Sequence, residues 1–257
     1  MQREWEGGEA GLSAILGFLE RAYREGAAAA VPADALPVLV RAGCRPTADG
    51  CFFFPRRRSF GGKVPLVERF IAFLLLIGLL PCFLLIALLV ACADGFPVIF
   101  RQERIGYGGN AFTLYKFRTM RQTARKVRDG MIRKWGESDR VFKLDHDPRV
   151  SPVGRLLRRS FLDELPQLLN VVKGEMRLFG PRPLPAYEHA HYHRSDQALR
   201  LVGVPGISGL WQVSGRNALS FDEMCLLDYY GLCHQGFWFN LWLLFRTVGT
   251  VFREMRT

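Results

Sequence analysis

One uninterrupted apolar stretch dominates the pattern of hydrophobic and polar positions along the chain. Phe70–Ala93 contains 24 residues without a charge, and 16 of them are Phe, Ile, Leu or Val. At about −0.3 to −0.6 kcal/mol each, these side chains favour membrane insertion by roughly 5 to 10 kcal/mol. A core helix of a soluble protein is seldom this long and apolar, so we expect a membrane segment.

Pro81 stands at the centre of this stretch, where it interrupts a helix. The halves Phe70–Leu80 and Cys82–Ala93 would each reach about 16–18 Å, near half the hydrocarbon thickness. Basic residues lie on both sides, among them Arg69 and Arg101. Because such residues favour the cytoplasm, the pattern favours a re-entrant helix-break-helix over about residues 66–94, with a single span as the alternative.

A second apolar periodicity runs through Phe237–Val251 and includes Trp238 and Trp242. This run is too short to span a bilayer, and tryptophan suits the headgroup boundary. The pattern is compatible with an interfacial amphipathic helix and equally with a core helix.

The remaining pattern predicts short helices and strands. Residues 1–62 read as an N-terminal appendage of unknown role, with a helix that starts near Leu12 and extends toward Ala30. Phe52–Phe54 is either a small strand or a membrane-touching patch. Residues 63–257 would form the main domain, and the fold class expected is an α-rich α+β membrane protein with a small globular region. Further expected elements are a strand at Phe112–Phe117, helices over 148–173 with breaks at Pro152 and Pro166, loops over 180–216, and a helix at Phe221–Tyr230.

Charge points to an anionic partner. The 257 residues include 35 Lys and Arg against 24 Asp and Glu, a net charge of +11. No helix-turn-helix or aromatic platform for nucleic acid is evident, so an anionic membrane or a phosphorylated substrate is favoured. The six cysteines contain no C-x-x-C pair, which favours reduced thiols over a metal framework.

The candidate chemistry centres on Asp163-Glu164, two adjacent carboxylates inside a basic stretch. Arg158 precedes them, and Arg182 follows between two prolines. A carboxylate that attacks phosphorus needs cations nearby, because its anionic substrate would otherwise repel it. Surface ion pairing is the plainer alternative for any single pair.

Several short strings occur along residues 63–257 in the order that is typical of one family, and together they resemble the bacterial sugar transferase family. These monotopic enzymes are polyprenyl-phosphate phosphoglycosyl transferases. The strings are Arg104-Ile105-Gly106, Lys116-Phe117-Arg118-Thr119-Met120, Asp147-Pro148-Arg149-Val150, Gly154-Arg155-Leu156-Leu157-Arg158-Arg159, Leu162-Asp163-Glu164-Leu165-Pro166-Gln167, Gly180-Pro181-Arg182-Pro183, Pro205-Gly206-Ile207-Ser208-Gly209 and Gly215-Arg216-Asn217.

The resemblance implies transfer of a sugar-1-phosphate from a nucleotide sugar, usually a UDP-sugar, to a polyprenyl phosphate, usually undecaprenyl phosphate. Asp163 would be the nucleophile and would also bind Mg2+, the expected cofactor. Glu164 would orient the groups of the site or transfer protons. UMP would leave, and a covalent aspartyl-phosphosugar would pass its group to the lipid.

The resemblance also implies the phosphate-binding residues. Arg158 and Arg182 match the arginines of the family, and guanidinium forks suit phosphoryl oxygens. Further expected contacts to phosphate are Lys116, Arg118, Arg216 and Asn217. Phe161 departs from the family pattern because Ser is usual there, so Ser160 would have to supply any supporting hydroxyl. Arg177 also replaces a usual Ser.

The expected location is the cytoplasmic face of the bacterial inner membrane, where such enzymes start lipid-linked glycan assembly, including that of exopolysaccharide. Expected partners are the UDP-sugar, the polyprenyl phosphate and membrane lipid, with no nucleic acid; a homo-oligomer stays open. Two alternatives remain: a Mg2+-dependent membrane phosphohydrolase of nucleotide sugars, and a non-catalytic membrane scaffold. The sequence does not name the sugar. Loops around the pocket set that choice, and one small group on the sugar changes the binding free energy by only about 1–3 kcal/mol.

Overall fold

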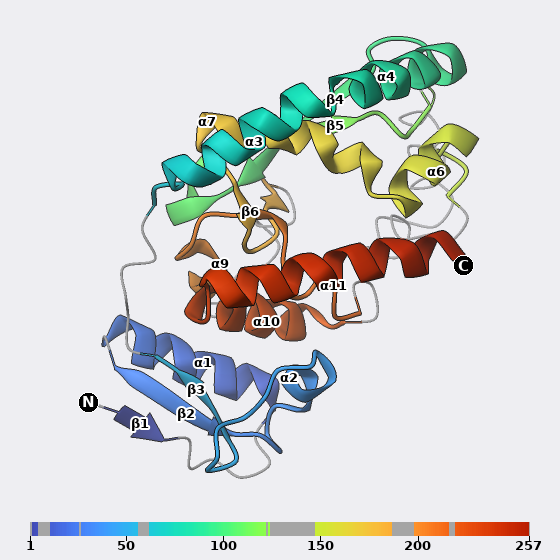
Figure 1. Cartoon of the computed structure of the whole chain (residues 1–257). Coiled ribbons are helices and arrows are strands. Elements are labelled where there is room, and N and C mark those ends of the chain that lie inside the picture. The colour runs from blue at the N-terminus through green and yellow to red at the C-terminus, as the bar shows by residue number, and fades with distance from the viewer. Residues whose placement is uncertain are drawn as a thin grey trace.

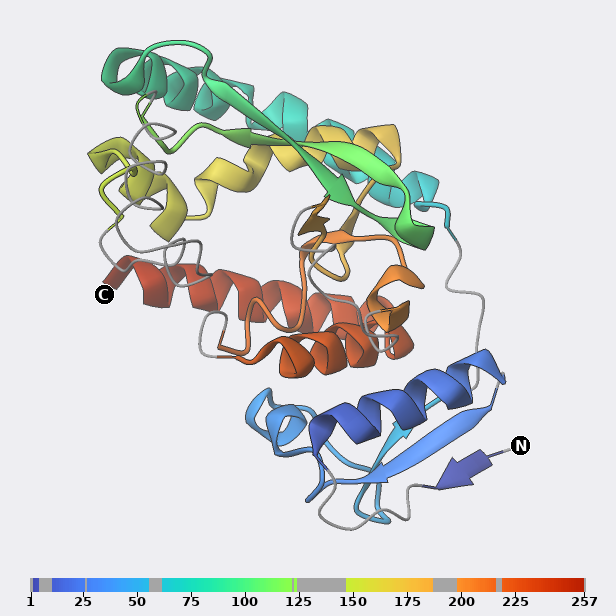
Figure 2. The ribbon, with the colours of Figure 1, turned by 180° about the vertical axis from the view of Figure 1, so that it is seen from behind.

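The structure is a computed structural model that describes residues 2–4, 11–25, 27–55, 62–121, 123, 147–186, 198–215 and 219–256. It combines helices with small sheets, as the sequence predicts. Three layers are visible in Figures 1 and 2. A small N-terminal unit lies at one end, and the helices α3 (Leu66–Gly78) and α4 (Leu80–Asp94) lie at the other. The helices α10 (Phe221–Cys233) and α11 (Phe237–Arg256) lie between them.

The N-terminal unit is a three-stranded sheet covered by one helix. The strand order is β1-β2-β3, with β1 parallel and β3 antiparallel to β2. Helix α1 forms because Ile15, Leu16 and Leu19 recur at helical spacing, and all three are buried. The elements are β1 Gln2–Glu4, α1 Leu12–Arg24, β2 Ala28–Pro32, α2 Pro37–Arg41 and β3 Cys51–Phe54.

The first helix ends earlier than the sequence pattern predicts. It stops at Arg24, and the alanine-rich segment that follows is the central strand β2. Alanine favours helices, but this preference amounts to less than about 1 kcal/mol per residue and is overridden by pairing with strands on both sides. The expected extension toward Ala30 is therefore wrong, whereas the small strand expected at Phe52–Phe54 is confirmed as part of β3.

The N-terminal unit packs on α10 (Phe221–Cys233), and the two share one hydrophobic core. Phe52 and Phe54 from β3 contact the rings of Tyr229 and Tyr230 on α10. Helix α10 is fixed at its start by a capping box, in which Ser220 and Glu223 bond each other's main-chain N–H. The predicted helix at Phe221–Tyr230 is thereby confirmed.

Two apolar helices, α3 (Leu66–Gly78) and α4 (Leu80–Asp94), follow the N-terminal unit. Among the described residues no single helix has the length and composition to cross a membrane, but this pair together does, with a bend of 62°. Pro81 lies in the first turn of α4, where its missing N–H costs no hydrogen bond. The break predicted near Pro81 is therefore confirmed.

Most large side chains of α3 and α4 are exposed. Only Ala72, Ile86 and Val90 of this pair are buried among the described residues. A soluble protein would rarely leave such a wide apolar surface in water. The exposed members are Leu66, Val67, Phe70, Ile71, Phe73, Leu74, Leu75, Ile77, Leu80, Leu84, Leu85, Leu88 and Leu89.

A long β-hairpin lies beside α3 and α7, as Figure 2 shows from behind. Its strands β4 (Ile99–Ile105) and β5 (Ala111–Phe117) pair over seven residues each. Gly108 and Gly109 have positive φ and close the turn η1 (Tyr107–Gly109). The short strand β7 (Leu184–Pro185) pairs with the free edge of β4.

The segment expected to be mainly helical consists of α6 (Pro152–Arg159), the 3-10 helix η3 (Leu162–Gln167) and α7 (Leu168–Lys173). Helix α6 begins at Pro152, and the Ser151 hydroxyl caps it by accepting a 2.9 Å hydrogen bond from the Gly154 N–H. The remaining described elements are β6 (Arg177–Phe179), α9 (Ala198–Leu201), β8 (Gly206–Ser208) and α11 (Phe237–Arg256).

Helix α11 is amphipathic, as predicted, and extends five residues beyond the expected end at Val251. Its apolar residues divide between two environments. Leu243 is buried in the core shared with α10, and Trp242 packs against that core. The other face exposes Phe237, Trp238, Leu244, Phe245, Val248, Phe252 and Met255. The helix therefore contacts the core along one side and leaves an apolar surface on the other.

Candidate active site

The carboxylate pair lies in η3, directly after a sharp turn. Phe161 adopts a left-handed conformation with φ 59°, which is uncommon for a bulky residue and separates α6 from η3. Asp163 and Glu164 follow in the first turn of η3, and both are buried. The Ser160 hydroxyl donates to the Leu156 carbonyl at 2.8 Å. Ser160 is thus bound to the end of α6.

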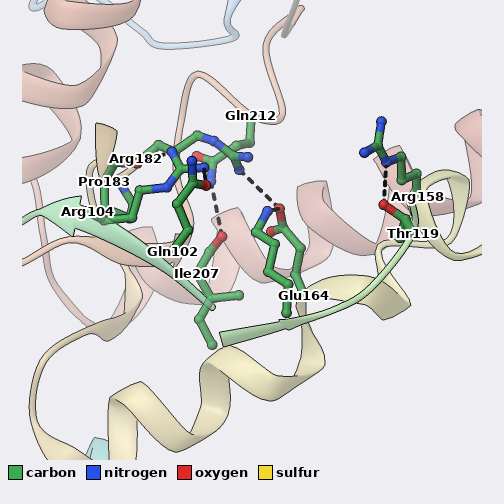
Figure 3. Close-up of polar contacts among 10 residues, drawn as sticks. Gln102, Arg104, Thr119, Arg158, Glu164, Arg182, Pro183, Ile207 and Gln212 are labelled. Carbon is green, nitrogen blue, oxygen red and sulfur yellow. Dashed lines mark hydrogen bonds and ion pairs between the residues drawn. The ribbon is translucent and has the colours of Figure 1, made fainter. Parts of the chain in front are cut away.

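Glu164 is held by two cations. Its Oε1 accepts a 2.7 Å hydrogen bond from the Lys116 Nζ and a 3.1 Å hydrogen bond from an Arg182 nitrogen. Figure 3 shows the contact between Arg182 and Glu164. Burial alone would favour the neutral acid, but the charges and hydrogen bonds of Lys116 and Arg182 outweigh it. The pKa of Glu164 is therefore lowered, and the side chain is a fixed negative charge.

Asp163 differs from its neighbour. In the part of the chain that the structure describes, no donor forms a hydrogen bond with the Asp163 carboxylate. Burial raises the pKa of Asp163, and the negative charge of Glu164 raises it further. Lys116, Arg158 and Arg182 oppose that shift. Asp163 is therefore a buried carboxylate in a positive surrounding, and no described donor occupies its oxygen lone pairs, the state expected of a nucleophile.

Arg182 reaches Glu164 from a tightly packed loop. The parallel pair β6 and β8 brings Gly180 against Gly206, where a Cβ on Gly206 would lie 2.0 Å from the Gly180 nitrogen. This close backbone approach requires glycine. The Arg104 guanidinium donates to the Pro183 carbonyl at 3.0 Å and thereby fixes the other side of the loop. Figure 3 shows Arg104 beside this loop.

Trp211 supports the guanidinium of Arg182. The Arg182 Cζ lies 5.7 Å from the centroid of the Trp211 ring, within cation–π range. Trp211 is largely buried, so its ring is part of the wall behind Arg182. The sequence did not indicate this contact, because no local spacing links the two residues.

Arg158 comes from the last turn of α6. Its Nε donates to the Thr119 hydroxyl at 2.8 Å, and its positive charge stabilises the ionised form of Asp163. Figure 3 shows the Arg158–Thr119 pair apart from the contact between Arg182 and Glu164. Two arginines therefore act on the carboxylate pair from separate elements. Thr119 lies within a string that the sequence singled out, but nothing in that string indicated its contact with Arg158.

The structure does not bring every expected phosphate contact to the carboxylate pair. Arg118 donates instead to the carbonyls of Asp94, at 2.5 Å, and of Gly95, at the C-terminal end of α4. Arg118 thereby ties the apolar pair α3–α4 to the hairpin. Arg177 forms an ion pair with Glu68 of α3. Arg216 and Asn217 lie outside the described residues.

The carboxylate pair offers oxygen ligands for the expected Mg2+. Among the described residues no group of three or more His, Cys, Asp or Glu side chains is placed to hold a metal. Mg2+, however, commonly binds one or two protein carboxylates and takes its other ligands from water and substrate phosphates. The Asp163 oxygens and the Glu164 Oε2 fit that pattern, because within the described ranges no donor bonds Asp163 and both cations bond the other oxygen of Glu164, Oε1.

The chain is similar to known proteins over most of its length. A family described as "Bacterial sugar transferase" matches residues 64–254. Galactosyl transferase CpsE of Streptococcus agalactiae is 40% identical over 179 residues, 68% of this chain and 40% of that protein. Undecaprenyl-phosphate galactose phosphotransferase of Salmonella typhimurium is 41% identical over 167 residues, 63% of this chain and 34% of that protein.

Exopolysaccharide production protein ExoY of Sinorhizobium fredii is 36% identical over 214 residues, which cover 80% of this chain and 94% of that protein. The chain thus matches well under half of the first two relatives and almost all of ExoY. The N-terminal unit lies before the matched family region. From residue 64 to residue 254, the chain belongs to the bacterial sugar transferase family.

Proposed function

We propose that this protein transfers a sugar-1-phosphate from a UDP-sugar to a polyprenyl phosphate, most simply undecaprenyl phosphate, through a covalent intermediate on Asp163. The main evidence for this proposal is that the two carboxylates of the pair differ in their contacts. Glu164 is bonded by Lys116 and Arg182, whereas Asp163 is buried, has no hydrogen-bond donor among the described residues and is surrounded by cations. The Salmonella relative is named as an undecaprenyl-phosphate galactose phosphotransferase, which supports the acceptor.

In the first displacement, an Asp163 oxygen forms a bond to the β-phosphorus of the UDP-sugar. The bond from that phosphorus to the oxygen bridging the two phosphates breaks, and UMP leaves with its electron pair. Arg158, Arg182 and Lys116 offset the charge on the phosphoryl oxygens. Splitting the exchange in two lets one pocket serve a soluble donor and then a lipid acceptor.

In the second displacement, a phosphate oxygen of the lipid attacks the same phosphorus. The bond from phosphorus to the Asp163 oxygen breaks, and the carboxylate is regenerated. When bound, Mg2+ would supply charge neutralisation at the diphosphate, with Asp163 as a ligand. Glu164, fixed by Lys116 and Arg182, keeps those two cations beside the reacting group.

We further propose that α3 and α4 enter and leave the membrane on the cytoplasmic face, and that the exposed face of α11 lies at the headgroup boundary. The exposed apolar surfaces of α3, α4 and α11 support this arrangement. Arg118 donates to carbonyls at the end of α4, so the membrane segment is joined to the hairpin that carries Lys116. This connection would place the carboxylate pair near the lipid phosphate.

A covalent-labelling experiment tests the proposal. The purified protein is mixed with a UDP-sugar labelled at its β-phosphate, without lipid acceptor, and denatured before separation. Label should remain on the wild-type protein, disappear when undecaprenyl phosphate is added, and be absent from Asp163→Asn. Asp34→Asn removes an exposed carboxylate of the N-terminal unit and should label like the wild type.

The two rival functions give other results. A phosphohydrolase would release UMP at full rate without lipid acceptor. A scaffold would tolerate Asp163→Asn with no loss. For the membrane arrangement, periplasm-confined reagents should reach a tag at neither end of the chain, and modification of an N-terminal tag alone would establish a spanning segment.

A further inference from the structure

A buried ion pair outside the carboxylate pair holds the main chain of Arg182. The Arg200 Nη2 donates to the Arg182 carbonyl at 3.1 Å. The same guanidinium bonds Asp228 Oδ2 through Nε at 2.8 Å and forms an ion pair through Nη2 at 2.7 Å. The side chains of Arg200 and Asp228 are only 4% and 1% exposed. Arg200 therefore connects α10 directly to the loop that carries Arg182.

One face of helix α10 contacts the Arg200 guanidinium. Phe221, Cys225 and Asp228 recur at four- and three-residue spacing, so they share one face of the helix. The Arg200 Cζ lies 5.6 Å from the Phe221 ring, and Cys225 lies between Phe221 and Asp228 on that face. Because Phe221 and Asp228 both contact Arg200 from one helix face, the position of Arg200 is set by α10.

Stability alone does not account for such a pair. Removing two charges from water costs several kcal/mol per ion, and their attraction in the interior often does no more than offset that cost. Apolar residues of similar size would often be equally stable. What an apolar pair would lack is a donor directed at the Arg182 carbonyl, a contact that reaches the site.

The contact holds a residue whose side chain bonds the carboxylate pair. Arg182 reaches Glu164 at 3.1 Å and lies over Trp211. A displacement of about 1 Å at a reacting group can reduce a rate about 100-fold. Fixing the Arg182 main chain therefore fixes the guanidinium that would meet the donor diphosphate.

We propose that Arg200 and Asp228 are positioning residues, which hold the Arg182 main chain so that its guanidinium meets the diphosphate of the donor. This inference rests on the proposed function, in which Arg182 binds that donor. Neither residue touches the carboxylate pair in the described structure, and both act through Arg182.

A double-mutant cycle on the full-length protein tests this role. Asp228→Asn keeps the side-chain shape but removes the charge, and it should lower kcat/KM about 10- to 100-fold. In a protein that already carries Arg182→Ala, the same change should have almost no further effect, because the group that it positions is gone. Equal, additive losses in both backgrounds would overturn the inference.

Arg200→Lys gives a second route if Asp228→Asn folds poorly. A lysine ammonium lacks the planar fork that serves the carboxylate and the carbonyl together, so the same non-additive loss is expected. Glu20→Gln is the matched control, because Glu20 is a buried carboxylate paired with Arg24 in the N-terminal unit. It should alter the melting temperature without changing kcat/KM.

Measuring the dissociation constant of the UDP-sugar in the same cycle separates the two claims. Wild-type protein that binds the donor without transferring its group would contradict the proposed function, while the binding cycle would still test the positioning role. Wild-type protein that transfers normally and gives an additive cycle would overturn the positioning role alone. Protein that neither binds nor transfers would overturn both.

Discussion

The Phe54 ring of β3 lies parallel to the Tyr229 ring of α10, with ring centroids 5.7 Å apart and an interplanar angle of 7°. Phe54 comes from the N-terminal unit, before the region that matches the sugar transferase family, whereas Tyr229 lies within that region. The contact is part of a hydrophobic core that both regions share. Helix α10 is therefore covered by the N-terminal unit on one side and contacts Arg200 on another.

Phe54→Ala should lower the free energy of unfolding by about 3–5 kcal/mol, because it removes a fully buried ring and leaves a cavity against Tyr229. Phe53 is the matched control, since it lies on the other face of the same strand and is 36% exposed. Phe53→Ala should change stability by no more than about 0.5 kcal/mol. Urea unfolding followed by tryptophan fluorescence measures both values.

The shared core would be contradicted by two unfolding transitions in urea, in the first of which the N-terminal unit unfolds while α10 keeps its structure. Two regions that bury the same side chains should unfold together. Hydrogen exchange of α1 and α10 distinguishes the two cases.

Gly154→Ala should destabilise the fold and displace Arg158 from its place in the site. A Cβ at this position would lie 2.0 Å from the Thr119 carbonyl oxygen, so the backbone of α6 or of Thr119 must shift. Thr119 also accepts the hydrogen bond from Arg158. We expect a stability loss of about 1–3 kcal/mol together with slower transfer, measured by thermal melting and by a transfer assay.

The control for that substitution is Gly249→Ala on α11, where a Cβ would meet nothing within 4 Å. Alanine is the better helix former, so this variant should be more stable by about 0.5–1 kcal/mol. Equal behaviour of the two variants would contradict the close contact at Gly154.

Transfer should decline on the acid side at a pH above the ordinary range of an aspartate. Burial and the charge of Glu164 raise the pKa of Asp163, so the nucleophile gains a proton as the pH falls through that raised value. Glu164→Gln removes the second negative charge, which lowers the pKa of Asp163 and should move the acid limb to lower pH. The pH dependence of kcat/KM measures this limb.

Glu103→Gln, an exposed carboxylate on β4, should leave the acid limb where it is. An acid limb that stays fixed in Glu164→Gln would mean that the two carboxylates of the pair do not interact as the geometry indicates.

Arg118→Gln should weaken the fold without weakening donor binding. Arg118 donates to carbonyls at the end of α4, and leaving these unsatisfied costs about 1–3 kcal/mol. Arg182→Gln should instead raise the dissociation constant of the UDP-sugar, because its guanidinium lies at the carboxylate pair. Calorimetric binding and thermal melting of both variants give the comparison. A similar loss of donor affinity in both variants would support the phosphate-binding role expected of Arg118.

Local patterns predicted much of the fold. The long apolar stretch indicated α3 and α4, Pro81 indicated the break between them, and alternation indicated β5. The end of α1 was predicted wrongly because Ala28–Pro32 becomes a strand only through pairing with β1 and β3. Such pairing depends on distant residues, which a local pattern does not contain.

The residues of the candidate site were likewise predicted only in part. Asp163, Glu164, Lys116, Arg158 and Arg182 all stand in recognisable strings, and the structure brings them together. Arg200 and Asp228 were missed because they are 28 residues apart and meet only through the fold. Arg118 is in a recognisable string, yet its side chain contacts α4, because position in a string does not determine side-chain direction.

Isotope exchange in the absence of lipid acceptor tests the covalent route most directly. Labelled UMP is incubated with the protein, Mg2+ and an unlabelled UDP-sugar. If Asp163 carries the sugar phosphate, the first displacement runs backwards and labelled UMP enters the UDP-sugar pool, and Asp163→Asn abolishes this exchange. Vigorous transfer to undecaprenyl phosphate with no exchange of UMP before the lipid is added would contradict the account.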